Sequence, residues 1–295
     1  MNLPPTGLLH LLVVYIVWSS TYLAFRVGVG PGGGWEPFPM GAARFIPAAL
    51  ILLSYAHRRR HRLWLSRREL ETLGLTGVLM WVGGNGLILI AAQYAPSNYQ
   101  ALMIAASPIW ANALEALLDR KRPAPLLILG LLLGLGGIAV LSVPKLAEPT
   151  PTSLLSFFLL LVSPVCWSAG SVITQRRPLE LDATVVSGYQ QLFGGIGFLL
   201  LAPLLGEGWS SPSLAGWGAL VYLIVAGSLL AYTSYILAVR LLPLSIVMTY
   251  AYVNPVLTAF LGWLLLGEQL TAWTLAGAAL VLIGVAGVFQ SRAKR

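Results

Sequence analysis

Aromatic and uncharged polar side chains recur inside the longest apolar stretches of this sequence. Residues 245–267 contain no charged residue, yet they include Tyr250 and Asn254. Residues 213–238 include Tyr232 and Tyr235 in a similar setting. Polar groups inside a membrane are costly unless they face protein or water. Because rings, hydroxyls and amides suit reversible binding of a small amphipathic molecule, we predict that they line a cavity near the middle of the membrane.

The predicted cavity residues share helix faces. Trp81 and Asn85 are four residues apart, and residues at this spacing lie on one side of a helix. The predicted substrate-binding residues are Trp18, Tyr22, Trp81, Asn85, Tyr99, Met103, Ser107, Trp167, Ser168, Tyr232, Tyr235, Tyr250 and Asn254. Two alternatives stay open, because tryptophan and tyrosine also form belts at membrane interfaces and asparagine also bonds neighbouring helices. The interfacial belt fits best those tryptophans that are at or beyond helix ends, namely Trp35, Trp64, Trp209 and Trp217.

Two prolines and one arginine are further candidates for roles inside the membrane. Pro108 and Pro255 leave backbone carbonyl groups free, and we predict that they bend their helices and act as hinges. Arg44 is a cation well inside a predicted span. It either attracts a substrate carboxylate, pairs with Glu115 across helices or has a structural role.

Several kinds of chemistry are not indicated. Residues 28–33 match G-x-G-x-x-G, but they follow an apolar helix and include Pro31, which argues against dinucleotide binding. The single cysteine, Cys166, excludes a disulfide within the chain and a thiolate metal cluster. The histidines are not spaced as metal ligands. We expect no cofactor, no metal and no enzyme activity, with a membrane-embedded lipid-modifying enzyme as the alternative from a different class.

Composition points to a membrane. Hydrophobic residues make up 57% of the chain, only 9% is charged, and the mean hydropathy is +0.80. Residues 1–7 lack the basic segment of a cleavable signal peptide. Long, uniformly apolar runs predict an all-α integral membrane protein. Its ten transmembrane helices are predicted at 8–29, 37–56, 70–92, 97–117, 124–143, 153–173, 183–205, 213–238, 245–266 and 271–290.

The cations predict how these helices are oriented. With the N-terminus in the cytoplasm, most of the eighteen Lys and Arg residues fall on the cytoplasmic side, including the arginine-rich segment 57–68. This segment is better explained by contact with lipid headgroups than by nucleic acid. We therefore expect a multi-pass protein of the bacterial inner membrane with both termini in the cytoplasm.

A fixed offset of 147 residues relates the two halves of the chain. It places Pro108 on Pro255, and it places Gly137 on Gly284. We predict two five-helix repeats, residues 1–147 and 148–295, and because five is odd the second is inserted with inverted topology. Such repeats are typical of secondary transporters, in which we expect the two halves to rock around a midplane site.

Short motifs in both halves match a known pattern. They are VWSS at 17–20, ARF at 43–45, AVRLLP at 238–243, NP at 254–255 and LGE at 266–268. The chain thereby resembles the drug/metabolite transporter superfamily, specifically its ten-helix EamA-type branch. The sequence LDRK at 118–121 departs from this pattern, which has LGE-like residues there. At Arg44 the resemblance favours the structural role.

The resemblance and the repeat together predict a secondary transporter. Among members of the superfamily the chain looks most like the exporters of aromatic amino acids. We expect it to export small amphipathic metabolites, aromatic or neutral amino acids first among them, by alternating access; export of other metabolites or drugs is the alternative. The expected partners are the small-molecule substrate and the lipid bilayer, without nucleic acid, and the protein is expected to be a monomer.

Overall fold

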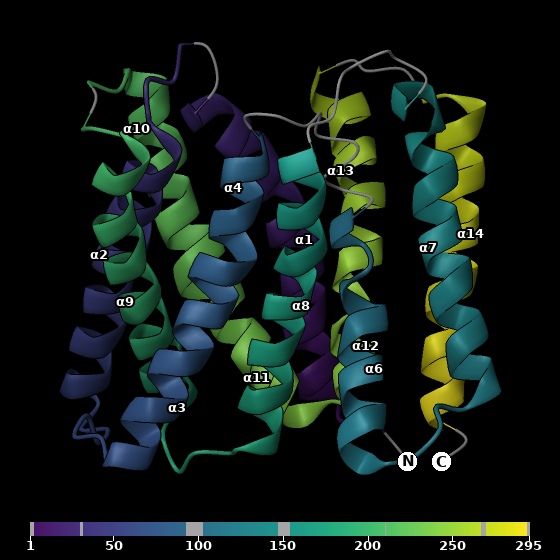
Figure 1. Ribbon diagram of the computed structural model, residues 1–295, viewed down its shortest axis with the longest axis horizontal. Helices are drawn as coiled ribbons and strands as arrows, with labels where there is room; N and C mark the ends of the chain where they lie inside the picture. Colours follow the sequence, from purple (N-terminus) through teal and green to yellow (C-terminus); the bar gives the residue numbers. More distant parts are fainter. Residues whose placement is uncertain are drawn as a thin grey trace.

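The protein is a bundle of helices that run side by side (Figure 1). The computed structural model describes residues 3–29, 32–92, 103–146, 154–209, 211–266 and 270–293, and all regular elements within these ranges are helical. Seven of the described helices are long and apolar enough to cross a membrane, and shorter apolar helices cover Pro5–Thr21 and Pro125–Val140. The all-α class predicted from the sequence is therefore confirmed for the described residues.

The helices of the two halves follow one another along the chain with short connections. The first half contains α1 (Pro5–Val29), α2 (Pro37–Arg58), a continuous rod of α3 (Arg67–Gly77), η1 (Val78–Gly86) and α4 (Leu87–Ala92), then α6 (Ser107–Asp119) and α7 (Pro125–Leu146). The second half contains α8 (Leu154–Arg176), α9 (Ala183–Leu201), the short η2 (Pro203–Leu205), a rod of α10 (Leu214–Tyr222), η3 (Leu223–Tyr232) and α11 (Thr233–Leu241), then α12 (Leu244–Val247), α13 (Tyr250–Leu266) and α14 (Ala272–Ala293). The predicted span 97–117 falls partly on residues 93–102, outside the described residues.

The two rods change from α-helical to π-helical geometry partway along. The π-helical segments are η1 and η3, and an offset of 147 carries η1 onto residues 225–233, almost the whole of η3. π turns are rare and are often found at functional positions. These π-helical segments were not predicted, because the side-chain pattern does not distinguish an i→i+5 hydrogen bond from an i→i+4 bond.

Helices α7 and α14 stand together at one side of the bundle and pack backbone against backbone (Figure 1). A Cβ added to Gly137 would lie 2.8 Å from the carbonyl oxygen of Gly277, and one added to Gly284 would lie 2.7 Å from that of Gly130. The 147-residue offset relates Gly137 to Gly284 and Gly130 to Gly277. These are therefore two copies of one contact, and they require that α7 and α14 run antiparallel.

Helices α2 and α9 also pack across the two halves. A Cβ on Gly41 would lie 2.8 Å from the ring of Phe198, and one on Gly188, its equivalent at the 147-residue offset, would lie 2.9 Å from the side chain of Leu53. Small residues of this kind allow helices to approach closely in a membrane. Because each half packs on the other through such pairs, the halves are interleaved and do not form two separate bodies.

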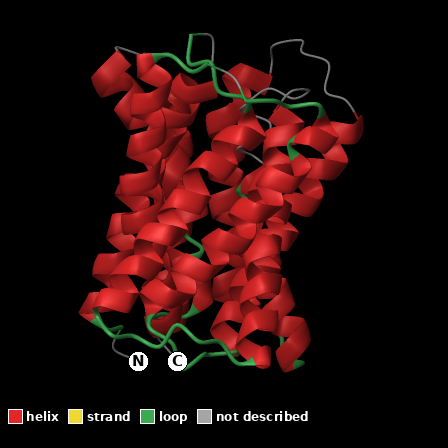
Figure 2. Cartoon of the chain, turned by 90° about the vertical axis from the view of Figure 1, so that its left-hand side faces the viewer, coloured by secondary structure: helices red, strands yellow, loops and turns green. Residues whose placement is uncertain are grey.

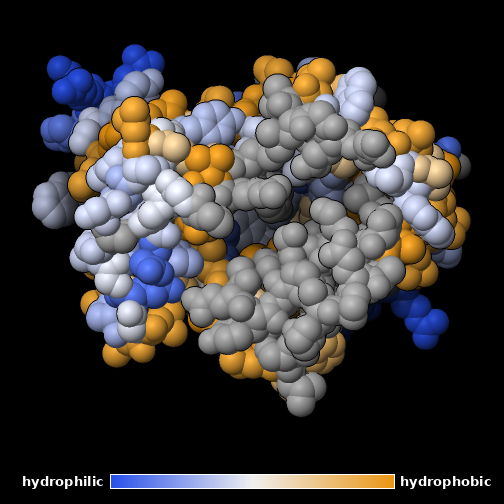
Figure 3. All heavy atoms as spheres, turned by 90° about the horizontal axis from the view of Figure 1, so that it is seen from above, coloured by the Kyte–Doolittle hydropathy of each residue, from blue (hydrophilic) through white to orange (hydrophobic). Residues whose placement is uncertain are grey.

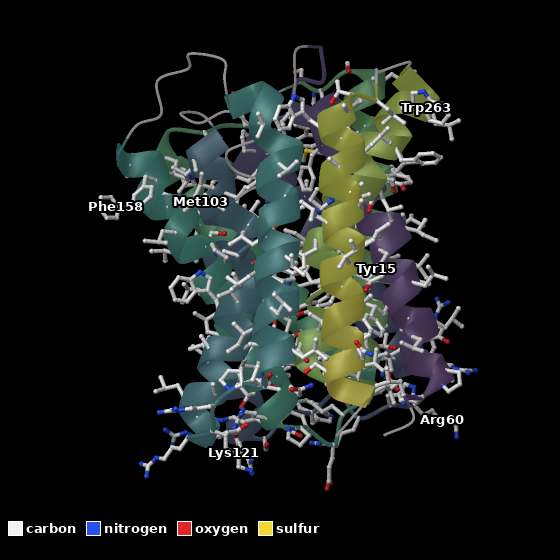
Figure 4. All side chains as sticks on the ribbon, turned by 90° about the vertical axis from the view of Figure 1, so that its right-hand side faces the viewer. Tyr15, Arg60, Met103, Lys121, Phe158 and Trp263 are labelled. Carbon is white, nitrogen blue, oxygen red and sulfur yellow. The ribbon has the colours of Figure 1, made fainter. Side chains whose placement is uncertain are left out.

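Both chain ends lie at one end of the bundle (Figure 2). Arg60 and Lys121 project at that same end (Figure 4), where Arg176 and Asp119 form an ion pair at 2.7 Å. Apolar residues dominate much of the outline of the molecule seen from the opposite end (Figure 3). This arrangement is typical of a bundle whose sides face lipid and whose ends face water.

Candidate functional site

Aromatic side chains from both halves meet in the middle of the bundle. We define the aromatic cluster as Trp18, Phe45, Trp81, Trp167, Tyr232, Tyr235 and Tyr250, all of them buried. The ring centroid of Trp18 lies 5.7 Å from Trp167, 5.2 Å from Tyr235 and 4.9 Å from Tyr250. The cluster therefore contains six of the thirteen predicted substrate-binding residues.

Trp81 connects the second part of the aromatic cluster. Its ring lies 5.6 Å from Trp167, 4.6 Å from Tyr232 and 4.3 Å from Phe45. Edge-to-face and tilted pairs such as these are favourable because the positive ring edge meets a negative ring face. The rings come from α1, α2, η1, α8, η3, α11 and α13, so one set of contacts holds together helices from both halves.

Hydrogen bonds at the rim of the aromatic cluster use several of its polar atoms. The hydroxyl of Tyr232 donates to Gln190 Oε1 at 2.9 Å, and the Trp18 indole N–H donates to the Gly227 carbonyl at 3.4 Å. The indole N–H groups of Trp81 and Trp167 are buried and make no hydrogen bond of good geometry to the described residues, although they face the hydroxyls of Tyr232 and Tyr235 respectively. A cluster of this kind offers ring faces together with two indole donors that are only weakly engaged.

Gln190 joins the aromatic cluster to the end of the bundle that carries the chain termini. Its Nε2 donates to Thr76 Oγ1 at 2.8 Å and to Thr174 Oγ1 at 3.1 Å, while its Oε1 accepts from Tyr232. A small pocket beyond it is lined in part by Thr72, Thr174 and Arg240. Gln190 is not among the residues predicted from the sequence, although two adjacent glutamines in the otherwise apolar stretch 183–205 point to a buried polar contact.

The two predicted asparagines bond to helix backbone and do not join the aromatic cluster. Asn85 Nδ2 donates to the Met80 carbonyl of its own helix at 3.4 Å. In the orientation that satisfies its neighbours, the Asn254 amide nitrogen donates to the carbonyls of Tyr15 and Tyr250 at 3.3 and 3.2 Å. The interhelical alternative considered for asparagine therefore describes Asn254, which ties α13 to α1.

The remaining predicted site residues lie apart from the aromatic cluster or outside the description. Ser168 Oγ donates to the carbonyl of Ser107 at 2.9 Å, which ties α8 to α6. Met103 packs in a separate apolar group with Ala91 and Leu160. Tyr22 belongs to α1, but its side chain is not among the parts that the structure describes. Tyr99 lies outside the described residues altogether.

The two predicted hinge prolines occupy different positions in their helices. Pro108 is in the first turn of α6, where a missing N–H costs nothing, so it begins a helix instead of bending one. Pro255 lies inside α13, close after a break at Met248–Thr249 that separates α12 from α13. The predicted helix over 245–266 is thus interrupted by one tighter turn with i→i+3 hydrogen bonds, although Leu244–Leu261 still forms one apolar span.

The structure excludes one of the alternatives left open for Arg44 and contradicts the interfacial position expected for Trp35. Arg44 does not pair with Glu115; its Nε donates to Ser228 Oγ at 2.8 Å. Trp35 is not an exposed interfacial residue, because its ring is 5% exposed and its indole N–H donates to the Gly216 carbonyl at 3.2 Å. Its position after a helix end suggested the interface, but the chain folds back over α10 there.

The apolar helices, the antiparallel glycine contact and the buried aromatic cluster together define a multi-pass helical membrane protein. The pattern of the EamA-like transporter family matches residues 5–143 and 154–290. The chain belongs to this family, within the drug/metabolite transporter superfamily, and is a membrane transporter.

Known relatives share this description. The uncharacterized inner membrane transporter YedA of Escherichia coli strain K12 is 32% identical over 263 residues, which cover 88% of this chain and 83% of YedA. The uncharacterized transporter YoaV of Bacillus subtilis strain 168 is 22% identical over 284 residues, 94% of each chain. A solved crystal structure with 20% identity superposes with a TM-score of 0.81 over 98% of both chains, which supports the fold.

Proposed function

We propose that the protein is a secondary transporter that exports small amphipathic metabolites, with aromatic and neutral amino acids as the first candidates. The observation that carries this proposal is the aromatic cluster, because its ring faces, indole N–H groups and tyrosine hydroxyls suit a substrate with an apolar body and a polar end. In the conformation described, these rings contact one another. Substrate would enter as they separate.

We propose further that the chain has ten transmembrane helices in two inverted repeats, residues 1–147 and 148–295. The symmetric antiparallel contact of α7 with α14, the matching π segments and the separate family matches to 5–143 and 154–290 support this proposal. The gathering of cations at the end that carries both termini supports cytoplasmic termini. The name of the YedA relative supports a bacterial inner membrane location.

Alternating access would have to use mixed groups of helices. The repeat predicts that each half rocks as a unit, but α2 packs on α9 and α7 packs on α14 across the halves. Separation of the rings would therefore move helices of both halves at once. The tighter turn between α12 and α13, next to Tyr250, is one place where such a movement needs little backbone rearrangement.

Flux measurements in proteoliposomes test the proposal. The purified chain should release preloaded phenylalanine, tryptophan or leucine faster than protein-free vesicles do. Trp81→Ala should slow this release by about tenfold or more, because it removes a ring that would contact the substrate, and burying such a ring face against the substrate is worth over about 1.4 kcal/mol. The matched control is Trp263→Ala, because Trp263 is 44% exposed and lies outside the aromatic cluster.

The outcomes separate the versions of this proposal. Equal slowing by both variants, at equal amounts of folded protein, would overturn the aromatic cluster as the binding site. Release of other metabolites or drugs but of no amino acid would favour the alternative substrate class. Accumulation driven by an imposed pH gradient would exclude simple facilitated export.

A further inference from the structure

Arg44 is a buried cation whose charge is not neutralised by a carboxylate in the part of the chain that the structure describes. Its side chain belongs to α2, in the interior of the bundle, and the residue is 4% exposed. No carboxylate among the described residues forms an ion pair with it. A buried charge loses several kcal/mol of hydration, which requires strong compensation.

The compensation that the protein itself supplies is modest. Arg44 Nε donates to Ser228 Oγ at 2.8 Å, and the guanidinium carbon lies 5.3 Å from the ring centroid of Phe25 and 4.8 Å from that of Phe45. A cation–π contact contributes about 0.5–2 kcal/mol. The terminal nitrogens Nη1 and Nη2 make no hydrogen bond to any described residue. These two nitrogens form the guanidinium edge that binds a carboxylate through two parallel hydrogen bonds, and no described residue occupies it.

The terminal nitrogens of Arg44 lie next to the aromatic cluster. Arg44 Nη2 would lie 2.7 Å from a Cβ on Gly227, so the missing side chain of Gly227 makes room for the guanidinium. The carbonyl of the same Gly227 accepts the indole N–H of Trp18. Phe45, the next residue on α2, is itself part of the aromatic cluster. The cation and the rings thus flank one short segment of η3.

The other half offers an uncharged counterpart. Residue 191 corresponds to Arg44 at the 147-residue offset, and Gln191 Nε2 donates to the carbonyl of Ser228 at 3.3 Å. Gln191 Oε1 is buried without a partner among the described residues. The equivalent helices α2 and α9 thus bring a guanidinium and an amide to the same residue, Ser228. Of the two side chains, only that of Arg44 is charged.

We infer that Arg44 recognises the carboxylate of the transported metabolite while the aromatic cluster binds its apolar part. This inference rests on the proposed function and narrows the substrate class to organic carboxylates, amino acids included. Amines and amides of the same shape lack the group that would neutralise Arg44. The Ser228 hydroxyl, already bonded to Nε, holds the guanidinium plane in a fixed orientation.

Thermal unfolding of the purified full chain in detergent tests the inference without assuming transport. Benzoate, phenylacetate and L-phenylalanine should raise the Tm, whereas phenethylamine and benzamide should not. Chloride and inorganic phosphate serve as probes for simple anion binding. In Arg44→Gln the apparent affinity for carboxylates should fall at least about thirtyfold, as expected when a buried charge pair loses one partner.

Two further variants separate recognition from structure. Arg44→Lys keeps the charge and should keep part of the carboxylate effect, while Gln191→Met removes a buried polar group from the same contact and should leave the selectivity for carboxylates unchanged. If no carboxylate stabilises the wild-type chain, or if chloride or phosphate does so equally well, the inference is overturned. It is also overturned if Arg44→Gln and Gln191→Met reduce carboxylate binding equally.

Flux with the same probes distinguishes this inference from the proposed function. Selective carboxylate binding without any flux would contradict the transport proposal and leave the role of Arg44 intact. Flux of phenethylamine as fast as that of phenylalanine would contradict the role of Arg44 and leave transport intact.

Discussion

At the scale of single residues, the interior of this protein depends on hydrogen bonds between buried polar side chains of different helices. Tyr232 is fully buried, and its hydroxyl supplies the hydrogen that satisfies Gln190 Oε1. Gln190 in turn donates to Thr76 and Thr174 on two other helices. Removing one hydroxyl therefore affects the positions of several helices.

Tyr232→Phe should lower the free energy of unfolding by about 1–3 kcal/mol, because it leaves a buried amide oxygen without a donor. The measurement is denaturant unfolding in detergent, with Tyr55→Phe as the control. Tyr55 is 51% exposed, so its hydroxyl can bond water and the change should stay within about 0.5 kcal/mol. A loss of equal size in both variants would show that the bond to Gln190 contributes nothing specific.

At the scale of helices, the contact between α7 and α14 leaves no room for a side chain. Gly137→Ala would place a Cβ 2.6 Å from the backbone nitrogen of Val281, and backbone cannot yield as a flexible side chain does. We expect it to lower the free energy of unfolding by about 1–3 kcal/mol. The readout is the Tm of the purified protein.

The neighbouring glycine provides the matched control. A Cβ on Gly136 would meet nothing within 4 Å, so Gly136→Ala gains helix propensity without a clash. It should leave the stability unchanged or raise it by roughly 0.5–1 kcal/mol. Destabilisation by Gly136→Ala as large as that by Gly137→Ala would argue against the close helix contact.

Sequence reasoning succeeded for helices and partly failed for the site. Apolar runs fix helix positions because every backbone group in lipid must be satisfied within its own segment. The faces of Trp18, Trp81 and Tyr235 followed from their spacing. The bond of Arg44 to Ser228 and the changes of helix geometry in η1, η3 and at Met248–Thr249 could not be predicted from spacing, since they depend on which helices become neighbours.

At the scale of the whole molecule, neither half can bury its own apolar surfaces. The α2 surface at Gly41 is covered by Phe198 of α9, and α7 is covered by α14. Each half alone would expose close-packing faces that have no partner. The two halves should therefore fold as one unit.

A chain divided between residues 147 and 148 tests this dependence. Residues 1–147 or 148–295 expressed alone should be degraded or aggregate, whereas both expressed together should copurify through a tag on either one. Copurified halves should also show the carboxylate-dependent Tm of the intact chain. Stable, monodisperse accumulation of one half alone would contradict the interleaved arrangement.

The glycine contact of α7 and α14 has a consequence for any movement that exchanges the roles of the two halves. Such an exchange would replace each contact by its equivalent at the 147-residue offset. In this pair the contact of Gly137 with Gly277 and its equivalent, Gly284 with Gly130, are both present in the same structure. The contact between α7 and α14 therefore stays the same when the two halves exchange conformations. We expect α7 and α14 to stay fixed while the remaining helices move. Reporter groups attached to this pair would then give a fixed reference for measuring the movement of the other helices.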